Sequence, residues 1–164
     1  MLKQGSHDKL KKNQMKKVLI AIDYNPTSEK VVMDGYKLAK SLGAEVCILH
    51  VITNLQYYGA QYPVFMGFES VNLSYDPRVH DEMKSIAKEY VSTVASHLGD
   101  DRILTHVAEG DTARAILEYS KEWGADLIVM GTHSHSTFEK LLIGTVANGV
   151  LEKTTIPVHM IPVK

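Results

Sequence analysis

Apolar residues along the chain fall into two patterns that alternate. Nearly continuous apolar runs predict buried strands, which we place at residues 18–23, 45–52, 103–108, 126–130 and 156–163. Between these runs, apolar residues recur at every third or fourth position, which predicts amphipathic helices at residues 28–42, 78–98, 111–123 and 144–152. Strands and helices that alternate across short turns are typical of an α/β domain built on a parallel sheet.

Polar residues mark the starts of the predicted helices, and glycines mark their ends. Ser28 is the expected N-cap of the first helix and Gly43 its stop, and the second helix is expected to end near Gly99. Asp111 is expected to cap the third helix. Asp23, at the end of the first strand, has two interpretations: it caps the following turn or helix, or it contacts a ligand.

Parallel α/β sheets bind ligands at one edge. Crossovers between parallel strands are right-handed in nearly every case, so a reversal in strand order places helices on both faces. Ligands bind at the carboxyl ends of the strands beside such a reversal. In this chain the first, second and fourth predicted strands end at Asp23, residues 51–52 and residues 130–131. These positions are therefore the first candidates for a binding site.

Composition narrows the class of protein. The chain has 164 residues, of which 45% are hydrophobic and 23% charged, which suits one domain with a core of ordinary size. A net charge of -1 disfavours binding of duplex nucleic acid through bulk positive charge. The chain has no run of about 18 apolar residues, no apolar N-terminal leader and only one cysteine, so we expect a cytoplasmic protein without disulfides.

Two segments fall outside the α/β pattern. Residues 1–14 are polar, rich in lysine and aperiodic; we expect a tail that is disordered or derived from an expression vector, with the domain at residues 15–164. Residues 53–77 form an unusually long connection that holds half of the aromatic residues: Tyr57, Tyr58, Tyr62, Phe65, Phe68 and Tyr75. These aromatics either pack over the sheet edge, or cover a ligand crevice or a partner surface.

An anion site is predicted after the fourth strand. Gly131 follows the strand directly, and Gly144 and Thr145 open a helix further along the chain. Glycine permits close backbone approach, and a helix N-terminus offers free N–H groups and the positive end of the helix dipole. The Thr145 hydroxyl can add a hydrogen bond, or ligate a metal that is bound to a phosphate.

Five stretches of the chain resemble the universal stress protein family. They are MKKVLIAID from residue 15, ILHVI from residue 48, ADLIVMGTHS from residue 125, LLIGTVANGVL from residue 141 and TTIPVHMIPV from residue 154. The resemblance covers residues 15–164 and implies a Rossmann-like sheet of five parallel strands, in the order 3-2-1-4-5, with helices on both faces. It also implies an adenine-nucleotide-binding protein of the stress response.

Nucleotide-binding members of that family carry the pattern G-x2-G-x9-G-[ST]. Here it reads Gly131, Ser134, Gly144 and Thr145, so the spacing is intact and serine replaces the second glycine. The resemblance implies that ATP or AMP binds, with Mg²⁺ entering only through the phosphates. We expect Ser134 to weaken or alter binding, with AMP or ADP favoured over ATP, because its side chain lies where backbone and phosphate should approach.

The resemblance also implies a role for each site residue. Asp23 would lie near the base and the ribose, the main chain of Ala21 and Val51 would frame the adenine, and Gly131 would lie against the ribose. The remaining residues would line the site or hold the phosphates. The complete predicted site is Ala21, Asp23, Val51, Met130, Gly131, His133, Ser134, Gly144, Thr145 and Val146.

Other chemistry finds little support in the sequence. Neither a P-loop nor a dinucleotide fingerprint follows any strand, and no Ser–His–Asp arrangement is evident. The H-x-H spacing of His133 and His135 is weak evidence for a metal. We interpret the other notable side chains as an inert core thiol and as interior or interface histidines: Cys47, His50, His106 and His159.

The last predicted strand bears on assembly. Pro157 and Pro162 remove backbone donors, which by itself would blunt an exposed sheet edge. The family resemblance implies instead a symmetric homodimer through antiparallel pairing of this strand, with Val158, Met160 and Ile161 near the two-fold axis. Two alternatives to the function of a nucleotide-binding stress protein stay open. The chain could be a dimeric interaction module that binds no nucleotide, or a slow ATPase.

Overall fold

A computed structural model describes residues 15–53, 77–132 and 143–163 of the chain. These residues form a sheet of five parallel strands in the order β3-β2-β1-β4-β5, which confirms the predicted topology. The strands are β1 Lys17–Ile22, β2 Glu45–Ile52, β3 Leu104–Glu109, β4 Leu127–Gly131 and β5 Val158–Ile161. The helices are α2 Ser28–Leu42, α4 Pro77–His97, α5 Thr112–Trp123 and α6 Thr145–Lys153.

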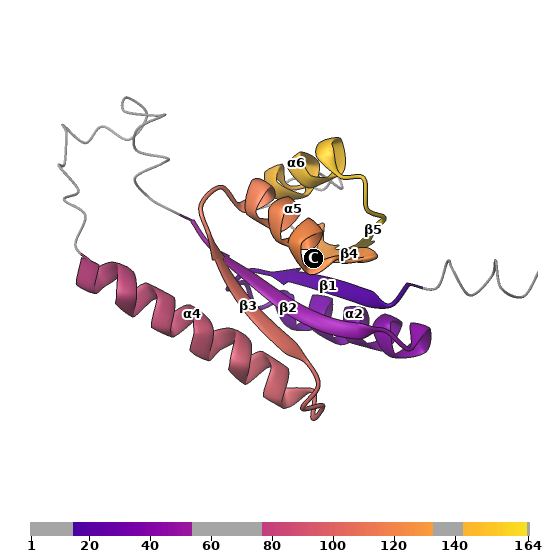
Figure 1. The fold of residues 1–164 in the computed structure, drawn as a ribbon, viewed down its shortest axis with the longest axis horizontal. Helices are drawn as coiled ribbons and strands as arrows, with labels where there is room; N and C mark the ends of the chain where they lie inside the picture. The colour runs from indigo at the N-terminus through magenta and orange to yellow at the C-terminus, as the bar shows by residue number, and fades with distance from the viewer. Residues whose placement is uncertain (1–14, 54–76, 133–142, 164) are drawn as a thin grey trace, which may run out of the picture.

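The helices cover both faces of the sheet, as Figure 1 shows. Successive strand residues point to opposite faces, so β1 buries Val18, Ile20 and Ile22 against α2 and α4, and Leu19 and Ala21 on the side of α5 and α6. Both sets are buried, which is why the parallel strands read as continuous apolar runs. The strand order reverses between β1 and β4, and this places the expected binding edge at the carboxyl ends of these two strands.

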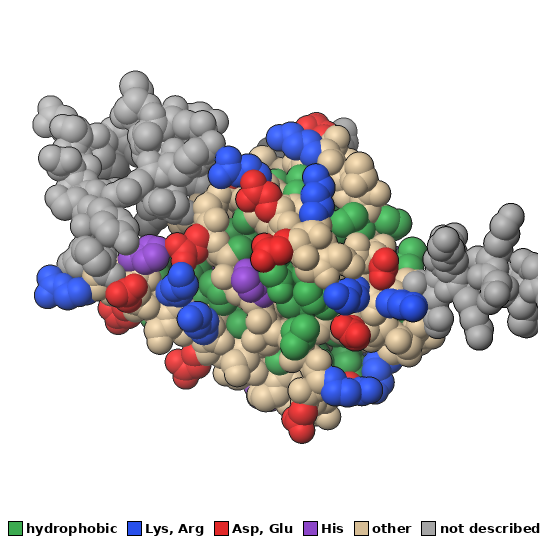
Figure 2. Space-filling view, viewed as in Figure 1, with side chains coloured by type: hydrophobic (Ala, Val, Ile, Leu, Met, Phe, Trp, Pro, Cys, Tyr) green, Lys and Arg blue, Asp and Glu red, His purple; other side chains and the backbone are tan. Residues whose placement is uncertain are grey.

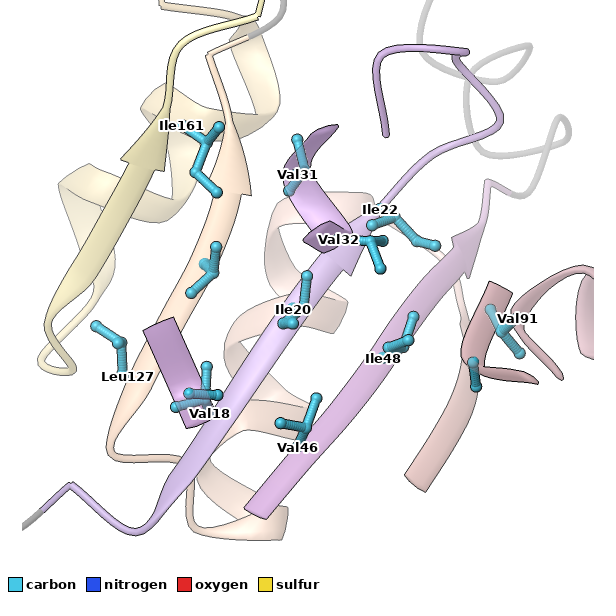
Figure 3. Packing of buried hydrophobic residues seen from close by; sticks show 13 residues of the cluster. Val18, Ile20, Ile22, Val31, Val32, Val46, Ile48, Val91, Leu127 and Ile161 are labelled. Atoms are coloured by element: carbon cyan, nitrogen blue, oxygen red, sulfur yellow. The ribbon is translucent and has the colours of Figure 1, made fainter. Parts of the chain in front are cut away.

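The face covered by α2 shows how closely helix and sheet approach (Figure 3). Val31 and Val32 of α2 are buried in the same cluster as Ile20 of β1. A Cβ placed on Gly35 would lie 3.0 Å from Val129 Cγ1 and 3.1 Å from Ile20 Cδ1. Glycine at this position therefore lets the middle of α2 lie directly on β1 and β4.

Two predicted helix ends are confirmed by their geometry. Asp111 precedes α5, and its Oδ1 accepts a hydrogen bond from the Arg114 amide at 2.9 Å, as an N-cap carboxylate should. Gly43 ends α2 in the left-handed conformation, with φ 64, which costs a glycine little.

The predicted cap of the first helix is wrong. Thr27 is the N-cap residue of α2 and makes no side-chain cap bond, whereas Ser28 is already helical. The Ser28 hydroxyl instead donates to the carboxylate of Asp23 at 2.6 Å. An N-cap hydroxyl accepts a hydrogen bond from an amide of its helix, whereas Ser28 Oγ accepts from the Asp23 amide at 3.3 Å and caps no amide of α2.

The last strand is shorter than predicted. β5 covers Val158–Ile161 rather than residues 156–163, since Pro157 and Pro162 flank it and neither has an N–H to donate.

β4 begins after Asp126, whose carboxylate accepts from the backbone amides of Lys16 at 2.8 Å and Lys17 at 3.0 Å. Asp126 therefore links the start of β4 to the start of β1 and is not itself part of β4.

Charge and hydropathy of the described part agree with the composition. Figure 2 shows basic and acidic side chains interspersed over the described part of the face in view, without a large patch of one sign. None of the described helices is long and apolar enough to cross a membrane. The tail at residues 1–14 and most of the aromatic connection, residues 54–76, lie outside the described residues, so the interpretations of both segments stay predictions.

Candidate functional site

A cavity of about 1070 Å³ opens at the carboxyl ends of β1, β2 and β4. It lies where the strand order reverses, which is the place expected for a ligand in a doubly wound sheet. Residues from both faces of the sheet line it, together with the start of α2, one face of α4 and the start of α6. The volume is ample for a nucleotide.

Eight of the ten predicted site residues line this cavity. They come from segments far apart in the sequence, and the fold brings them together: Ala21, Asp23, Val51, Met130, Gly131, Gly144, Thr145 and Val146. The other two, His133 and Ser134, lie outside the described residues, so their roles stay predictions. His135 of the weak metal motif lies in the same segment.

The N-terminus of α6 presents backbone donors at one end of the cavity. Gly144 is the N-cap residue, with extended backbone at φ -61 and ψ 157, and provides no side-chain cap. The first amide to pair within the helix is that of Asn148, which donates to the Gly144 carbonyl at 2.9 Å. No described residue accepts from the preceding amides of Thr145, Val146 and Ala147. These amides and the helix dipole favour an anionic group.

Asp23 lines the cavity, and its two carboxylate oxygens differ in their hydrogen bonds. Oδ1 accepts from the Ser28 hydroxyl at 2.6 Å and from the Asn25 amide at 3.0 Å. The interpretation of Asp23 as a cap of the following turn is therefore correct. The turn uses Oδ1, and no described residue donates to Oδ2.

An aromatic cluster lies beside Asp23. The rings of Tyr24 and His50 have centroids 4.3 Å apart, and those of Tyr24 and Tyr90 lie 4.8 Å apart. The Tyr90 hydroxyl donates to the Asp23 carbonyl oxygen at 2.7 Å. Tyr24 is 55% exposed and lines the cavity, so its ring presents an apolar surface next to the carboxylate.

His50 is held through one ring nitrogen, and its burial disfavours the charged form. It is buried, and its Nδ1 lies 3.0 Å from the Ile22 carbonyl oxygen, which can only accept, so Nδ1 carries the proton. Burial lowers the pKa of His50, although the bond to Ile22 and the charge of Asp23 act in the opposite direction. The interpretation of His50 as a satisfied interior histidine is confirmed.

The other singled-out side chains lie away from the cavity. Cys47 is buried as expected, and burial raises the pKa of its thiol, which keeps it protonated and inert. His106 is partly buried and stacks on Tyr119 with ring centroids 3.8 Å apart. His159 is exposed on β5, so it is not an interior residue, and its place at an interface stays a prediction. No group of three metal-ligating side chains occurs among the described residues.

Sequence reasoning missed the residues that surround Asp23. Tyr24, Ser28, Met83 and Ile86 line the cavity, and Tyr90 anchors the main chain of Asp23. The sequence could have predicted Tyr24 as a lining residue, because it follows Asp23 directly and so lies at the same edge of the sheet. No pattern in the sequence links α4 to β1, so the roles of Met83, Ile86 and Tyr90 emerge only from the fold.

Comparison with known proteins places this site in context. A sequence model of the universal stress protein family matches residues 15–162. The universal stress protein A homolog 2 of Coxiella burnetii is 30% identical over 150 residues, which cover 91% of this chain and 96% of that protein.

Solved structures share the fold. The structure of MJ0577, a universal stress protein of Methanocaldococcus jannaschii, superimposes with a TM-score of 0.69 at 22% identity and covers 92% of this chain and 98% of that chain. A universal stress protein in complex with cAMP superimposes with a TM-score of 0.62 at 20% identity, over 92% of this chain and 99% of that chain.

Proposed function

The chain belongs to the universal stress protein family, and on that premise we propose that it binds an adenine nucleotide in the cavity at the carboxyl ends of the strands. The observation that carries the proposal is the meeting, in one cavity, of an acceptor and a set of donors. Asp23 offers a carboxylate oxygen, and the start of α6 offers amides that no described residue accepts from. The ribose of a nucleotide carries hydroxyl donors, and its phosphates are acceptors.

The lining suits each part of such a ligand. The anionic phosphates would lie at Gly144, Thr145 and Val146, where the dipole and the amides of α6 compensate their charge. The ribose hydroxyls would donate to Asp23. The base would lie among apolar lining residues such as Ala21, Val51 and Met130. Mg²⁺ would enter with the phosphates, with Thr145 as its candidate protein contact.

Binding, rather than turnover, is the activity that we propose. No arginine or lysine lines the cavity among the described residues, so the described lining supplies no cationic side chain for the charge of a transferred phosphoryl group. The protein would therefore act in the stress response by changing state or partner with the nucleotide it holds. The rival in which the chain binds no nucleotide and serves as an interaction module is decided by the experiment below.

Two measurements test the proposal together. Purified protein is extracted with acid and the released nucleotides are identified, and the emptied protein is titrated with AMP, ADP and ATP in a calorimeter. We expect adenine nucleotide near one per chain, or saturable binding of at least one of the three. Neither retained nucleotide nor heat of binding would overturn the proposal and favour the interaction module.

We also propose a symmetric homodimer through β5. Ile161 is buried in its own chain, so at an interface it would contribute only its backbone, while Val158 and Met160 are partly buried and His159 is exposed. Sedimentation of the purified chain would show a dimer at micromolar concentration if β5 pairs, and a monomer if the flanking prolines blunt this edge.

A further inference from the structure

Ser28 is a buried polar residue that the proposed function has not yet used. We propose that Ser28 is a positioning residue: its hydroxyl holds the Asp23 carboxylate so that Oδ2 accepts hydrogen bonds from the ribose hydroxyls of a bound nucleotide. This inference rests on the proposed function, because it assumes that a nucleotide enters the cavity. It adds a residue from α2 whose contribution passes through another side chain.

The link between Ser28 and Asp23 runs in both directions. The Ser28 hydroxyl donates to Asp23 Oδ1 at 2.6 Å, and the Asp23 amide donates back to Ser28 Oγ at 3.3 Å. The short bond is charge-assisted, because its acceptor is a carboxylate. The pair therefore restrains the side chain of Asp23 and its backbone at the same time.

A second restraint leaves one oxygen for a ligand. The Asn25 amide also donates to Asp23 Oδ1, at 3.0 Å, so both described donors to the carboxylate use the same oxygen. Oδ2 receives no hydrogen bond from a described residue, and Asp23 lines the cavity. Holding one oxygen in this way fixes where the other one is.

Restraint matters here because Asp23 is exposed. A surface carboxylate normally samples several rotamers and loses that freedom when it binds a ligand. Ser28 is only 5% exposed and sits in the first turn of α2, whose position against β1 is set by the core. Because Ser28 is itself held in place by the core, its hydrogen bond can hold the Asp23 carboxylate in one orientation before a ligand binds.

The main chain of Asp23 has a further anchor on the opposite side. The Tyr90 hydroxyl of α4 donates to the Asp23 carbonyl oxygen at 2.7 Å. Two helices thus hold this residue: α2 through the carboxylate and α4 through the backbone. Of the two helices, only α2 contacts the carboxylate, and it does so through the side chain of Ser28, which makes Ser28 the specific test.

The experiment compares two ligands in the variant Ser28→Ala. AMP has both ribose hydroxyls, and 2′,3′-dideoxy-AMP has neither, so only AMP can use Asp23 Oδ2. We expect the affinity for AMP to fall about tenfold, because the Asp23 carboxylate is no longer held in place and must be ordered when the ribose binds, while the affinity for the dideoxy compound changes less than twofold. A merely structural role would lower both affinities equally.

A matched control and a second variant complete the design. Ser120→Ala removes another buried hydroxyl, one that donates to the Leu117 carbonyl within α5 and lies outside the cavity lining, so both affinities should stay within twofold of the wild type. Ser28→Cys keeps the buried volume with a weaker donor, and should show the same selective loss to a smaller degree. It replaces Ser28→Ala if that variant does not fold.

Each outcome decides the inference. In the background of Asp23→Asn, the change Ser28→Ala should cause no further loss of AMP affinity, because the two residues act as a unit. Equal losses for the two ligands, or no loss for either, would overturn the positioning role and leave nucleotide binding intact. Failure of the wild-type chain to bind AMP would overturn the proposed function, and the role of Ser28 with it.

Discussion

The amino and carboxyl ends of the sheet differ in how far their polar groups are hydrogen-bonded within the protein. At the amino end, Asp126 accepts from two backbone amides of the neighbouring chain segment, and Asp100 accepts from the Tyr36 hydroxyl at 2.8 Å and from Arg102 at 2.9 Å. These charges are satisfied by the protein itself. The amino end therefore contributes to the stability of the fold and offers little to a ligand.

At the carboxyl end, polar groups are only partly satisfied. Asp23 uses one oxygen within the protein, and the first amides of α6 have no acceptor among the described residues. Both ends belong to the same layers of strands and helices, so the architecture alone does not explain the difference. It arises because the reversal between β1 and β4 keeps the helices apart at this edge and leaves a cavity between them.

The largest expected effect is on nucleotide affinity, at the carboxyl end of the sheet. Gly144→Val places a branched side chain at the start of α6, where the phosphates would lie, and should lower the affinity for adenine nucleotide at least a hundredfold, a loss of about 3 kcal/mol. The backbone of Gly144 is extended, a conformation that valine adopts readily, so the melting temperature should change little.

Calorimetric titration and thermal unfolding of the same preparation check this prediction, and Gly144→Ala should show a smaller loss. Unchanged affinity in Gly144→Val would mean that the ligand binds elsewhere.

A matched pair of variants tests the contrast between the two ends directly. Tyr36→Phe and Tyr90→Phe each remove one hydroxyl that donates to an aspartate, at the amino and the carboxyl end respectively. Each should lower the free energy of unfolding by about 1 kcal/mol. Only Tyr90→Phe should also reduce AMP affinity, by a few fold, because it loosens Asp23. Equal effects of the two variants on binding would contradict the division between the ends.

The smallest expected effect is on the pH dependence of stability, and it concerns Asp100 at the amino end of the sheet. Hydrogen bonds from Arg102, and next from Tyr36, hold the pKa of Asp100 well below its usual range. Because the folded-state pKa is depressed, the stabilisation is present above the unfolded pKa of about 4 and is lost as the pH falls further.

Thermal unfolding without ligand at pH 7 and near pH 3 checks this prediction in the wild type and in Asp100→Asn. The wild type should be the more stable at pH 7, and its advantage should shrink at pH 3. An advantage of the same size at both pH values would show that the charge of Asp100 is not the cause.

Local chemistry was enough to predict most elements of the fold. Apolar runs located the strands, and the Asp111 carboxylate and Gly43 marked helix ends, because a cap depends on residues within one turn. The error at Ser28 has the same origin: a serine at a helix start usually caps, and the sequence does not show that its hydroxyl will bond the amide and the carboxylate of Asp23 instead. The shorter β5 follows from its prolines, whose missing donors were visible but whose effect on length was underestimated.

The candidate site could be predicted only in part. Residues at the ends of strands, such as Asp23 and Gly131, were identified because the carboxyl ends of parallel strands share one edge. Tyr90, by contrast, lies in the helix predicted at residues 78–98, and its sequence position alone predicts no role at the site. Its contact with Asp23 spans 67 positions in the sequence and depends on how α4 packs across the sheet. Periodicity gives the buried face of a helix, but not the atom that each side chain reaches.

The amino-acid sequence by itself determined the class of fold, the order of its elements and the family, because hydrophobic periodicity, caps and short motifs act over a few residues. Only the tertiary structure decided that α2 and α4 meet at Asp23, that Ser28 holds one oxygen of its carboxylate, and that burial lowers the pKa of His50. Those properties depend on burial and on distances between distant segments, and these exist only once the chain has packed.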